Sequence, residues 1–170
     1  MLDIKESVKN ILSSHGLTGC DTVGVYHGIG KGVALNVLRT VQYPLSHLGD
    51  TEVSEVSQCT PFMLACTNRA ACQSLTEVRH KIRTTKVSPG TASAPKLQTL
   101  PQTTEAFNEN VACASLQVTI WKTAMNPMTP ALNPTDFGWT KDDGTRSQPA
   151  TPVPHDVTLV PQKLLKLIRC

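Results

Sequence analysis

The residues best placed to do chemistry form a short glycine-rich segment near the start of the chain. Gly28, Ile29 and Gly30 are followed directly by Lys31 and Gly32. Two glycines around one apolar residue allow a tight reversal between two helices, partly at positive φ, with Ile29 inserted between the helices. The N–H groups that begin the second helix then face outward beside the Lys31 charge, and such a helix start suits a phosphate. Contacts of this kind position a nucleic-acid backbone without reading its bases.

This segment, together with Gly19-Cys20-Asp21 upstream of it, resembles the flap endonuclease family of structure-specific 5′ nucleases. The family pattern is Gly-Ser/Cys-Asp at the end of a PIN-like core, a short spacer, Gly-Ile-Gly, and a helix with a small residue such as Ala34. The resemblance covers residues 15–41 and implies a helix-hairpin-helix unit over 17–41. It also implies that Asp21 is one of several carboxylates that hold two divalent cations, Mg²⁺ in a complete protein, and that the hairpin grips the backbone of double-stranded DNA.

A second resemblance covers nearly the whole chain. Residues 15–22 are similar to the "HALTGCDT" signature of a group of proteins that look like mobile-element products in fish, coral and other invertebrate genomes, with Gly16 where the group has Ala. The group shares a helix similar to 103–125, a segment similar to 133–139, and an ending similar to 164–170, after which longer members have a cysteine-rich tail. This resemblance implies that the chain is the C-terminal part of a flap-nuclease-like protein, cut at both ends.

The chain departs from the nuclease pattern in its acidic residues. Two-metal hydrolysis of a phosphodiester needs several carboxylates that converge on the cations. The acids nearest Asp21 in the sequence are Asp3, Glu6 and Asp50, and none forms a suitably spaced pair. The PIN-like α/β core that would supply the other ligands is missing. We therefore expect a non-catalytic chain with no cofactor of its own, in which Asp21 is a vestigial metal ligand or the N-cap of a helix over 22–26.

Apolar periodicity predicts a mainly α fold with long irregular stretches. The expected helices cover residues 3–14, 21–26, 31–41, 60–84 (one or two helices), 104–125, and a terminal segment from 161. Asp3 is the expected N-cap of the first helix, and Gly16 its end. Residues 43–58 are expected to form a loop.

Three helix starts are predicted further along the chain. Thr60 followed by Pro61 has the composition of an N-cap and a first helical position. Ser74 or Thr76 is suited to cap a second helix, and Thr103 to cap the longest one.

The longest helix carries an uninterrupted apolar stripe, made of Phe107, Val111, Ala114, Val118, Trp121 and Met125. A stripe of this length must pack on something. It is the expected surface for a protein partner, which leaves a helical interaction or structural fragment, without a nucleic-acid ligand, as the alternative function.

Other candidate sites fit their chemistry poorly. Four side chains invite a zinc interpretation: Cys59, Cys66, Cys72 and His80. Their spacing lacks the close cysteine pairs of structural zinc sites, so free thiols packed in the interior are expected. Cys20 beside His15 or His27 is rejected as a nucleophile, because the adjacent Asp21 disfavours the thiolate.

Two further motifs have ordinary explanations. Asp136-Phe137-Gly138 lacks the other kinase motifs, so Phe137 and Trp139 are expected to pack onto the helices. The basic run over 79–83, with Lys86, is expected to be a solvated helix face, with phosphate contacts as the alternative.

The chain divides into five expected parts: a flap-nuclease-like helical region over 1–84, a linker over 85–102, an amphipathic helix over 103–125, a proline-rich irregular segment over 126–160, and a truncated terminal helix over 161–170. The net charge is only +3, with 17% charged residues, so bulk charge neither requires nor excludes a nucleic-acid partner. The polar start is unlike a signal peptide and no apolar run reaches membrane-helix length, so we expect an intracellular protein with reduced thiols and no membrane contact, without a choice between nucleus and cytoplasm. Scarce aromatic residues predict marginal stability.

Overall fold

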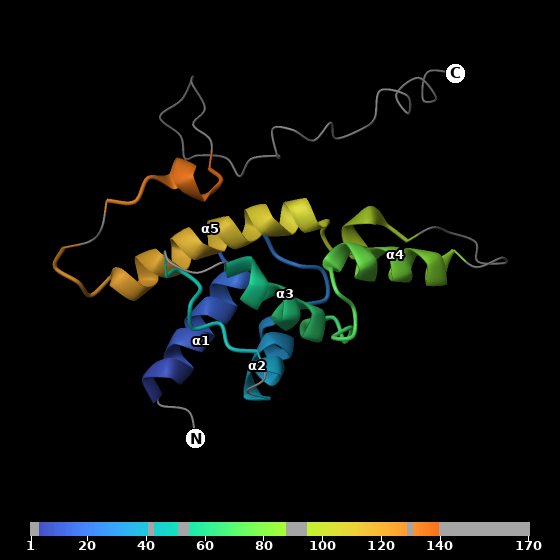
Figure 1. Ribbon diagram of the computed structural model, residues 1–170, viewed down its shortest axis with the longest axis horizontal. Coiled ribbons are helices and arrows are strands. Elements are labelled where there is room, and N and C mark those ends of the chain that lie inside the picture. Colours follow the sequence, from blue (N-terminus) through green and yellow to red (C-terminus); the bar gives the residue numbers. More distant parts are fainter. Residues whose placement is uncertain (1–3, 41–42, 51–54, 88–94, 129–130, 140–170) are drawn as a thin grey trace, which may run out of the picture.

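The computed structural model describes residues 4–40, 43–50, 55–87, 95–128 and 131–139 (Figure 1). Over these residues the protein is mainly α, as predicted, and contains no strand. The expected terminal helix from residue 161 lies outside the described residues, as do Asp3 and most of the proline-rich segment.

The described residues form five α-helices and two short 3₁₀ helices: α1 (Ile4–Leu17), α2 (Lys31–Arg39), α3 (Glu55–Cys66), α4 (Leu75–Lys86), η1 (Leu97–Thr99), α5 (Thr104–Thr123) and η2 (Pro134–Phe137). The long helix α5 is the central element, since it contacts α1, α3, α4 and η2. Figure 1 shows α1, α2 and α3 on one side of α5 and η2 on the other. Helix α2 packs on α1 and α3.

Two of the predicted helix caps are confirmed. The Ser74 side chain accepts a hydrogen bond from Glu77 N at 3.1 Å, at the start of α4. The Thr103 side chain accepts one from Ala106 N at 3.3 Å, at the start of α5. Each bond satisfies a backbone donor that has no partner within its helix.

Helix α3 begins earlier than predicted. It starts at Glu55, so the start proposed at Thr60 and Pro61 is wrong, as is the loop proposed over 55–58. Pro61 lies inside the helix, where proline removes a backbone donor. The helix persists because its inward face buries Phe62 and Met63 completely, and burial of large apolar side chains offsets the local cost of proline.

Helix α1 also runs beyond its predicted end, to Leu17. Gly16 lies within α1 and does not terminate it. A methyl group on Gly16 would lie 2.7 Å from Val118 Cγ2, so glycine allows α1 to approach α5 closely. The left-handed residue after the helix is Gly19, with φ +105°. The close contact with α5 therefore explains why residue 16 is glycine, whereas the local sequence pattern predicts a helix end there.

The segment over 43–50 is anchored to α1 and α5, although it has no regular structure. Leu45 and Leu48 are buried, and Leu45 N donates to Asn10 Oδ1 at 2.8 Å. Gly49 has φ +84°, and its carbonyl accepts a hydrogen bond from Thr119 Oγ1 at 2.8 Å. These contacts place a loop in the core beside the α1–α5 contact.

The apolar stripe on α5 packs inside the chain. Four of its members are buried in the common core: Phe107, Val111, Ala114 and Val118. Trp121 is partly buried against this core, whereas Met125 lies beyond the helix end and is 93% exposed. The surface expected to receive a protein partner is thus largely covered by this chain's own helices.

The segment around η2 packs on the outer side of α5. Trp139 lies against the core, as expected, and the Phe137 carbonyl accepts a hydrogen bond from Cys113 Sγ at 3.6 Å. Within the described part of the chain, no helix has the length and apolar character needed to cross a membrane.

Candidate nucleic-acid interface

The segment that leads into the hairpin is not the helix predicted over 21–26. It runs as bends and irregular backbone, with Val23 and Tyr26 buried in the core and Val25 76% exposed. Glycine and β-branched residues are weak helix formers, and this stretch contains Gly24 between two valines. The helix that precedes α2 in the chain is therefore α1, and an irregular segment joins the two.

The turn has the left-handed glycine and the buried apolar residue that the sequence predicts, although the helix expected before it is absent. Gly28 adopts φ +77°, a left-handed conformation that favours glycine. Ile29 is only 8% exposed and joins the core, and its N–H donates to the Tyr26 carbonyl at 3.2 Å. Gly30 is the N-cap of α2, with extended backbone at φ −86° and ψ 169°.

The start of α2 is open to solvent. Its N-cap residue is Gly30, which has no side chain to accept a hydrogen bond, and the first-turn donors of a helix have no partner within the helix. A methyl group added to Gly28, Gly30 or Gly32 would meet no atom of the described residues within 4 Å. The positive end of the α2 dipole is thus unobstructed, which is the geometry that an anion requires.

Lys31 does not point to the open side of the hairpin. Its ammonium donates to the His15 carbonyl at 2.8 Å, to Thr18 Oγ1 at 3.1 Å, and to the Gly19 carbonyl. These oxygens lie at the C-terminal end of α1, where the helix dipole favours a cation. Burial lowers the pKa of the Lys31 ammonium, and Cys20 opposes that shift. The sequence-based expectation placed this charge beside the phosphate, whereas in the structure it ties α2 to α1.

Asp21 is exposed, and because no helix follows it, it is not an N-cap. Among the described residues, no group of three or more His, Cys, Asp or Glu side chains is arranged to hold a metal ion. Magnesium needs an octahedral shell of oxygen ligands. The described surroundings of Asp21 therefore do not fit the two-metal site that the family resemblance implies.

The cysteines considered for zinc lie inside the fold. Cys59, Cys66 and Cys72 are buried, as expected, and His80 is exposed. Burial raises the pKa of the Cys66 thiol to about 12. The thiol of Cys72 accepts a hydrogen bond from Lys81 Nζ at 3.5 Å. Packing accounts for their burial, because cysteine packs as a small apolar side chain.

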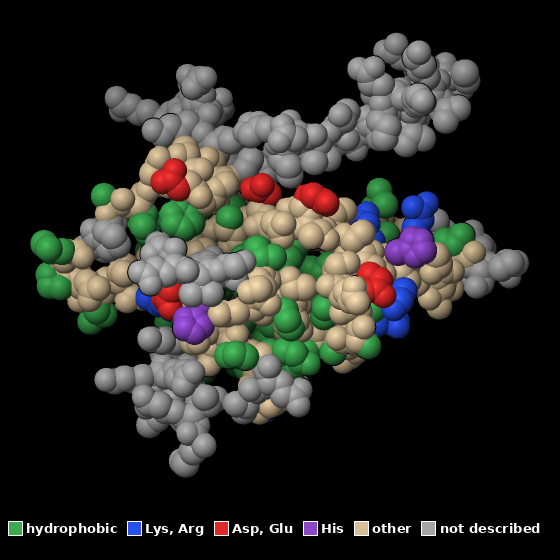
Figure 2. All heavy atoms as spheres, in the orientation of Figure 1, with side chains coloured by type: hydrophobic (Ala, Val, Ile, Leu, Met, Phe, Trp, Pro, Cys, Tyr) green, Lys and Arg blue, Asp and Glu red, His purple; other side chains and the backbone are tan. Residues whose placement is uncertain are grey.

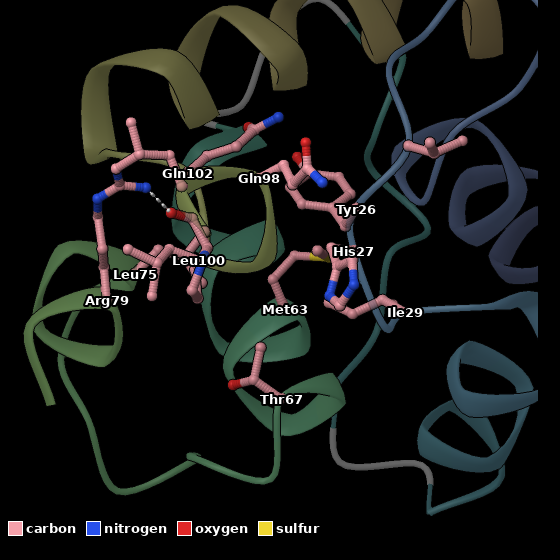
Figure 3. A pocket seen from close by; sticks show the side chains of 13 residues that line it. Tyr26, His27, Ile29, Met63, Thr67, Leu75, Arg79, Gln98, Leu100 and Gln102 are labelled. Atoms are coloured by element: carbon pink, nitrogen blue, oxygen red, sulfur yellow. Dashed lines mark hydrogen bonds between the residues drawn. The ribbon is translucent and has the colours of Figure 1, made fainter. Parts of the chain in front are cut away.

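A pocket of about 260 Å³ adjoins the hairpin (Figure 3). Four segments line it: 25–29, the end of α3 with Thr67, the first half of α4, and 97–102. The Tyr26 hydroxyl and Gln102 Oε1 are buried without a hydrogen-bond partner. Figure 3 shows Tyr26, Gln98 and Gln102 along one side of this pocket. The sequence gives no sign of this pocket, because residues 25–29 and 97–102 are far apart in the chain and carry no shared motif.

Helix α4 presents a basic face beside the pocket. His80, Lys81, Arg83 and Lys86 are exposed, and Lys81 forms an ion pair with Glu77 at 2.6 Å. Figure 2 shows basic side chains and a histidine gathered at the end of the molecule that α4 forms. Arg79 belongs to this helix and also lines the pocket, where its Nη1 donates to the Pro101 carbonyl at 2.6 Å.

Comparisons with known proteins add no relative to this description. No family model, no curated protein and no solved structure matches the chain. The resemblances to flap endonucleases and to the HALTGCDT group therefore stay predictions, and a function has to be argued from the geometry of the site.

Proposed function

We propose that this chain binds the phosphodiester backbone of double-stranded DNA through the start of α2, without reading bases and without cutting. The observation that carries the proposal is the open start of α2, where the N-cap is a glycine and no described atom lies within 4 Å of a methyl group placed on Gly28, Gly30 or Gly32. Backbone N–H groups at a helix start, aided by the helix dipole, are suited to phosphate oxygens.

Lys31 supports this contact indirectly. By donating to three oxygens at the end of α1, it orients the start of α2 relative to the rest of the fold. Ile29 does the same from the apolar side, because its burial anchors the hairpin in the core. Both residues hold the donors in place and leave the glycines to approach the ligand.

Binding without catalysis is the part of the proposal that concerns Asp21. Hydrolysis by two metal ions needs several converging carboxylates. The proposal assigns no step of this kind to Asp21 and is restricted to binding.

The test is a change at Gly30 that separates folding from binding. Gly30→Asp places a carboxylate at the N-cap. There it can accept hydrogen bonds from the N–H groups of the first helical turn and repel a phosphate. We expect unchanged or slightly higher stability, since Asp is among the preferred N-caps. Affinity for a fluorescent duplex, followed by anisotropy, should fall by about tenfold or more, because like charges at a contact are strongly unfavourable.

Two controls sharpen the result. Gly30→Asn offers the same cap without the charge and should weaken binding less than Gly30→Asp. Gly24→Ala changes a nearby exposed glycine, where a methyl group makes an ordinary 3.5 Å contact with Asn110 Nδ2, and should leave binding unchanged. Equal duplex affinity for the parent protein and Gly30→Asp would overturn the proposal. Cleavage products in the presence of Mg²⁺ would overturn its non-catalytic part.

A further inference from the structure

We infer that the pocket beside the hairpin, together with the adjoining face of α4, binds an acidic peptide segment of a partner protein through one apolar anchor side chain. This surface is separate from the start of α2, so the inference goes beyond the proposed contact with nucleic acid and does not depend on it. It is also separate from the apolar stripe of α5, which this chain's own helices largely cover.

The interior of the pocket suits one large apolar side chain. Its lining includes four apolar residues that are each less than a tenth exposed: Ile29, Met63, Leu75 and Leu100. The volume of about 260 Å³ lies just under the roughly 300–1,000 Å³ that sites for drug-sized ligands occupy. The pocket therefore accommodates a single anchor residue, with the rest of the peptide outside it.

Two exposed apolar side chains extend the pocket at its rim. Val25 is 76% exposed and Leu97 is 75% exposed, and both line the pocket. A single exposed apolar residue is ordinary on a protein surface, but two beside one apolar pocket enlarge its apolar area toward solvent. Such a surface gains free energy when a partner removes it from water. The rim thus provides contact for the residues on either side of the anchor.

The face of α4 that lines the pocket continues along the helix as a basic stripe. Leu75 and Arg79 line the pocket, and Figure 3 shows them on the same side of it. Arg83 and Lys86 are exposed and follow Arg79 at steps of four and three residues, which places them on the same helix face. Glu77, the one acidic residue of α4, lies two residues from Leu75 and therefore on a different face.

This charge selects an acidic partner. Among the described residues, no Asp or Glu lines the pocket. Complementary charge attracts and orients a partner, whereas a like charge at the contact is unfavourable. From Leu75 to Lys86 the helix spans about 16 Å, which a peptide covers with about three helical turns or about five extended residues. The partner segment therefore has its apolar anchor at one end and acidic side chains over Arg79, Arg83 and Lys86.

The experiment selects random peptides of about 12 residues, displayed on phage, for binding to the immobilised protein; a helical peptide of that length covers the stripe. We expect the enriched peptides to share one large apolar residue and several acidic residues on one side of it. The most enriched peptide is then labelled with fluorescein, and its affinity is measured by anisotropy. The affinity should fall severalfold between low and moderate salt, because salt screens exposed charges.

Two pairs of variants test the apolar and the charged part of the surface. Leu97→Gln should weaken peptide binding about fivefold, because less apolar surface is buried. Met125→Gln is its control, since Met125 is also an exposed apolar residue and does not line the pocket. Arg83→Glu should weaken binding about tenfold by repelling the acidic residues. Arg39→Glu makes the same change of charge at the end of α2 and should leave the affinity unchanged.

A thermal melt excludes misfolding as the cause of weaker binding. All four substituted side chains are exposed, and surface substitutions of this kind change stability little. The thermal midpoints of the four variants should therefore stay close to that of the parent protein.

The remaining outcomes separate this inference from the proposed function. It is wrong if no peptide is enriched, if the enriched peptides are neutral or basic, or if Leu97→Gln and Arg83→Glu bind the peptide as tightly as the parent protein. If Arg83→Glu weakens duplex binding and leaves peptide binding unchanged, the basic stripe contacts nucleic acid and the acidic-peptide site is wrong. Gly30→Asp should leave peptide affinity unchanged, so a failure of the contact at α2 is distinguishable from a failure here.

Discussion

Glycine occurs at the α1–α5 contact and at the hairpin, in opposite surroundings. At the contact, methyl groups on Gly16 and Gly49 would lie 2.7 Å from Val118 Cγ2 and 2.9 Å from Thr119 N. At the hairpin, a methyl group on Gly30 or Gly32 would meet no described atom within 4 Å. Close packing inside the chain therefore explains the first pair and offers no explanation for the second. An open glycine at a helix start is what the proposed contact with an external backbone requires.

The largest effect is expected in the packed region. Gly49→Val combines a left-handed backbone, φ +84°, with overlap against α5. We expect a loss of about 3 kcal/mol in the free energy of unfolding, since conformational strain and overpacking each cost on the order of 1–3 kcal/mol. Urea denaturation measures it, with Gly30→Val as the matched substitution at the open site. Equal unfolding midpoints for Gly49→Val and Gly30→Val would contradict the claim that the first glycine is closely packed and the second is open.

A smaller loss is expected where the two regions are joined. Lys31→Met keeps much of the side-chain length and removes the three hydrogen bonds to the end of α1. We expect it to lower the free energy of unfolding by about 1.5–2 kcal/mol, the low end of the range for hydrogen bonds to a charged group, because Lys31 is exposed. Lys96→Met, at an exposed lysine, is the control for the lost charge. Unchanged stability together with lost DNA binding would instead assign Lys31 to the ligand.

The packed region should also respond to alkaline pH. Burial holds the pKa of Cys66 at about 12 and that of Cys113 at about 11, above the ordinary value of 9.0. A raised thiol pKa contributes stability that is complete below pH 9 and is lost as pH rises through the folded-state values. The slope is at most about 1.4 kcal/mol per pH unit for one group. We expect Cys66→Ala to have a shallower decline than the parent between pH 9 and 11 in urea titrations, and an identical slope would contradict this.

The smallest effect is expected at the second residue of α2. Gly32→Ala adds a methyl group in open space and replaces a poor helix former with the best one. We expect the free energy of unfolding to rise by about 0.5 kcal/mol, partly through the unfolded chain. A thermal melt suffices to detect the sign. A fall in the midpoint would mean that a neighbour occupies this space, and would count against an open α2 start.

Sequence pattern located the features that depend on near neighbours. The caps at Ser74 and Thr103 are of this kind, because a cap needs only a side chain within three residues of a helix donor. The tight turn at Gly28 and the burial of Ile29 follow from two glycines around an apolar residue. The mainly α class follows from apolar periodicity over the longer helices.

The predictions that the structure contradicts share one physical cause, which is contact between parts of the chain that are distant in sequence. The sequence pattern at Gly16 predicts a helix end, but Gly16 lies within α1, where its close approach to Val118 on α5 requires a glycine. The sequence pattern at Pro61 predicts a helix start, but Pro61 lies inside α3, where the burial of neighbouring side chains stabilises the helix. Residues 21–26, expected to be helical, form an irregular segment whose Val23 and Tyr26 side chains are buried in the core.

The candidate site divides in the same way. Residue order alone placed two glycines and a lysine at a helix start, because a turn and the helix after it are local in the chain. Only the tertiary structure decided that Lys31 reaches back to α1, and that Tyr26, Arg79 and Gln102 meet at one pocket. Hydrogen bonds and cavities of this kind depend on how helices pack, and packing is set by the whole core at once.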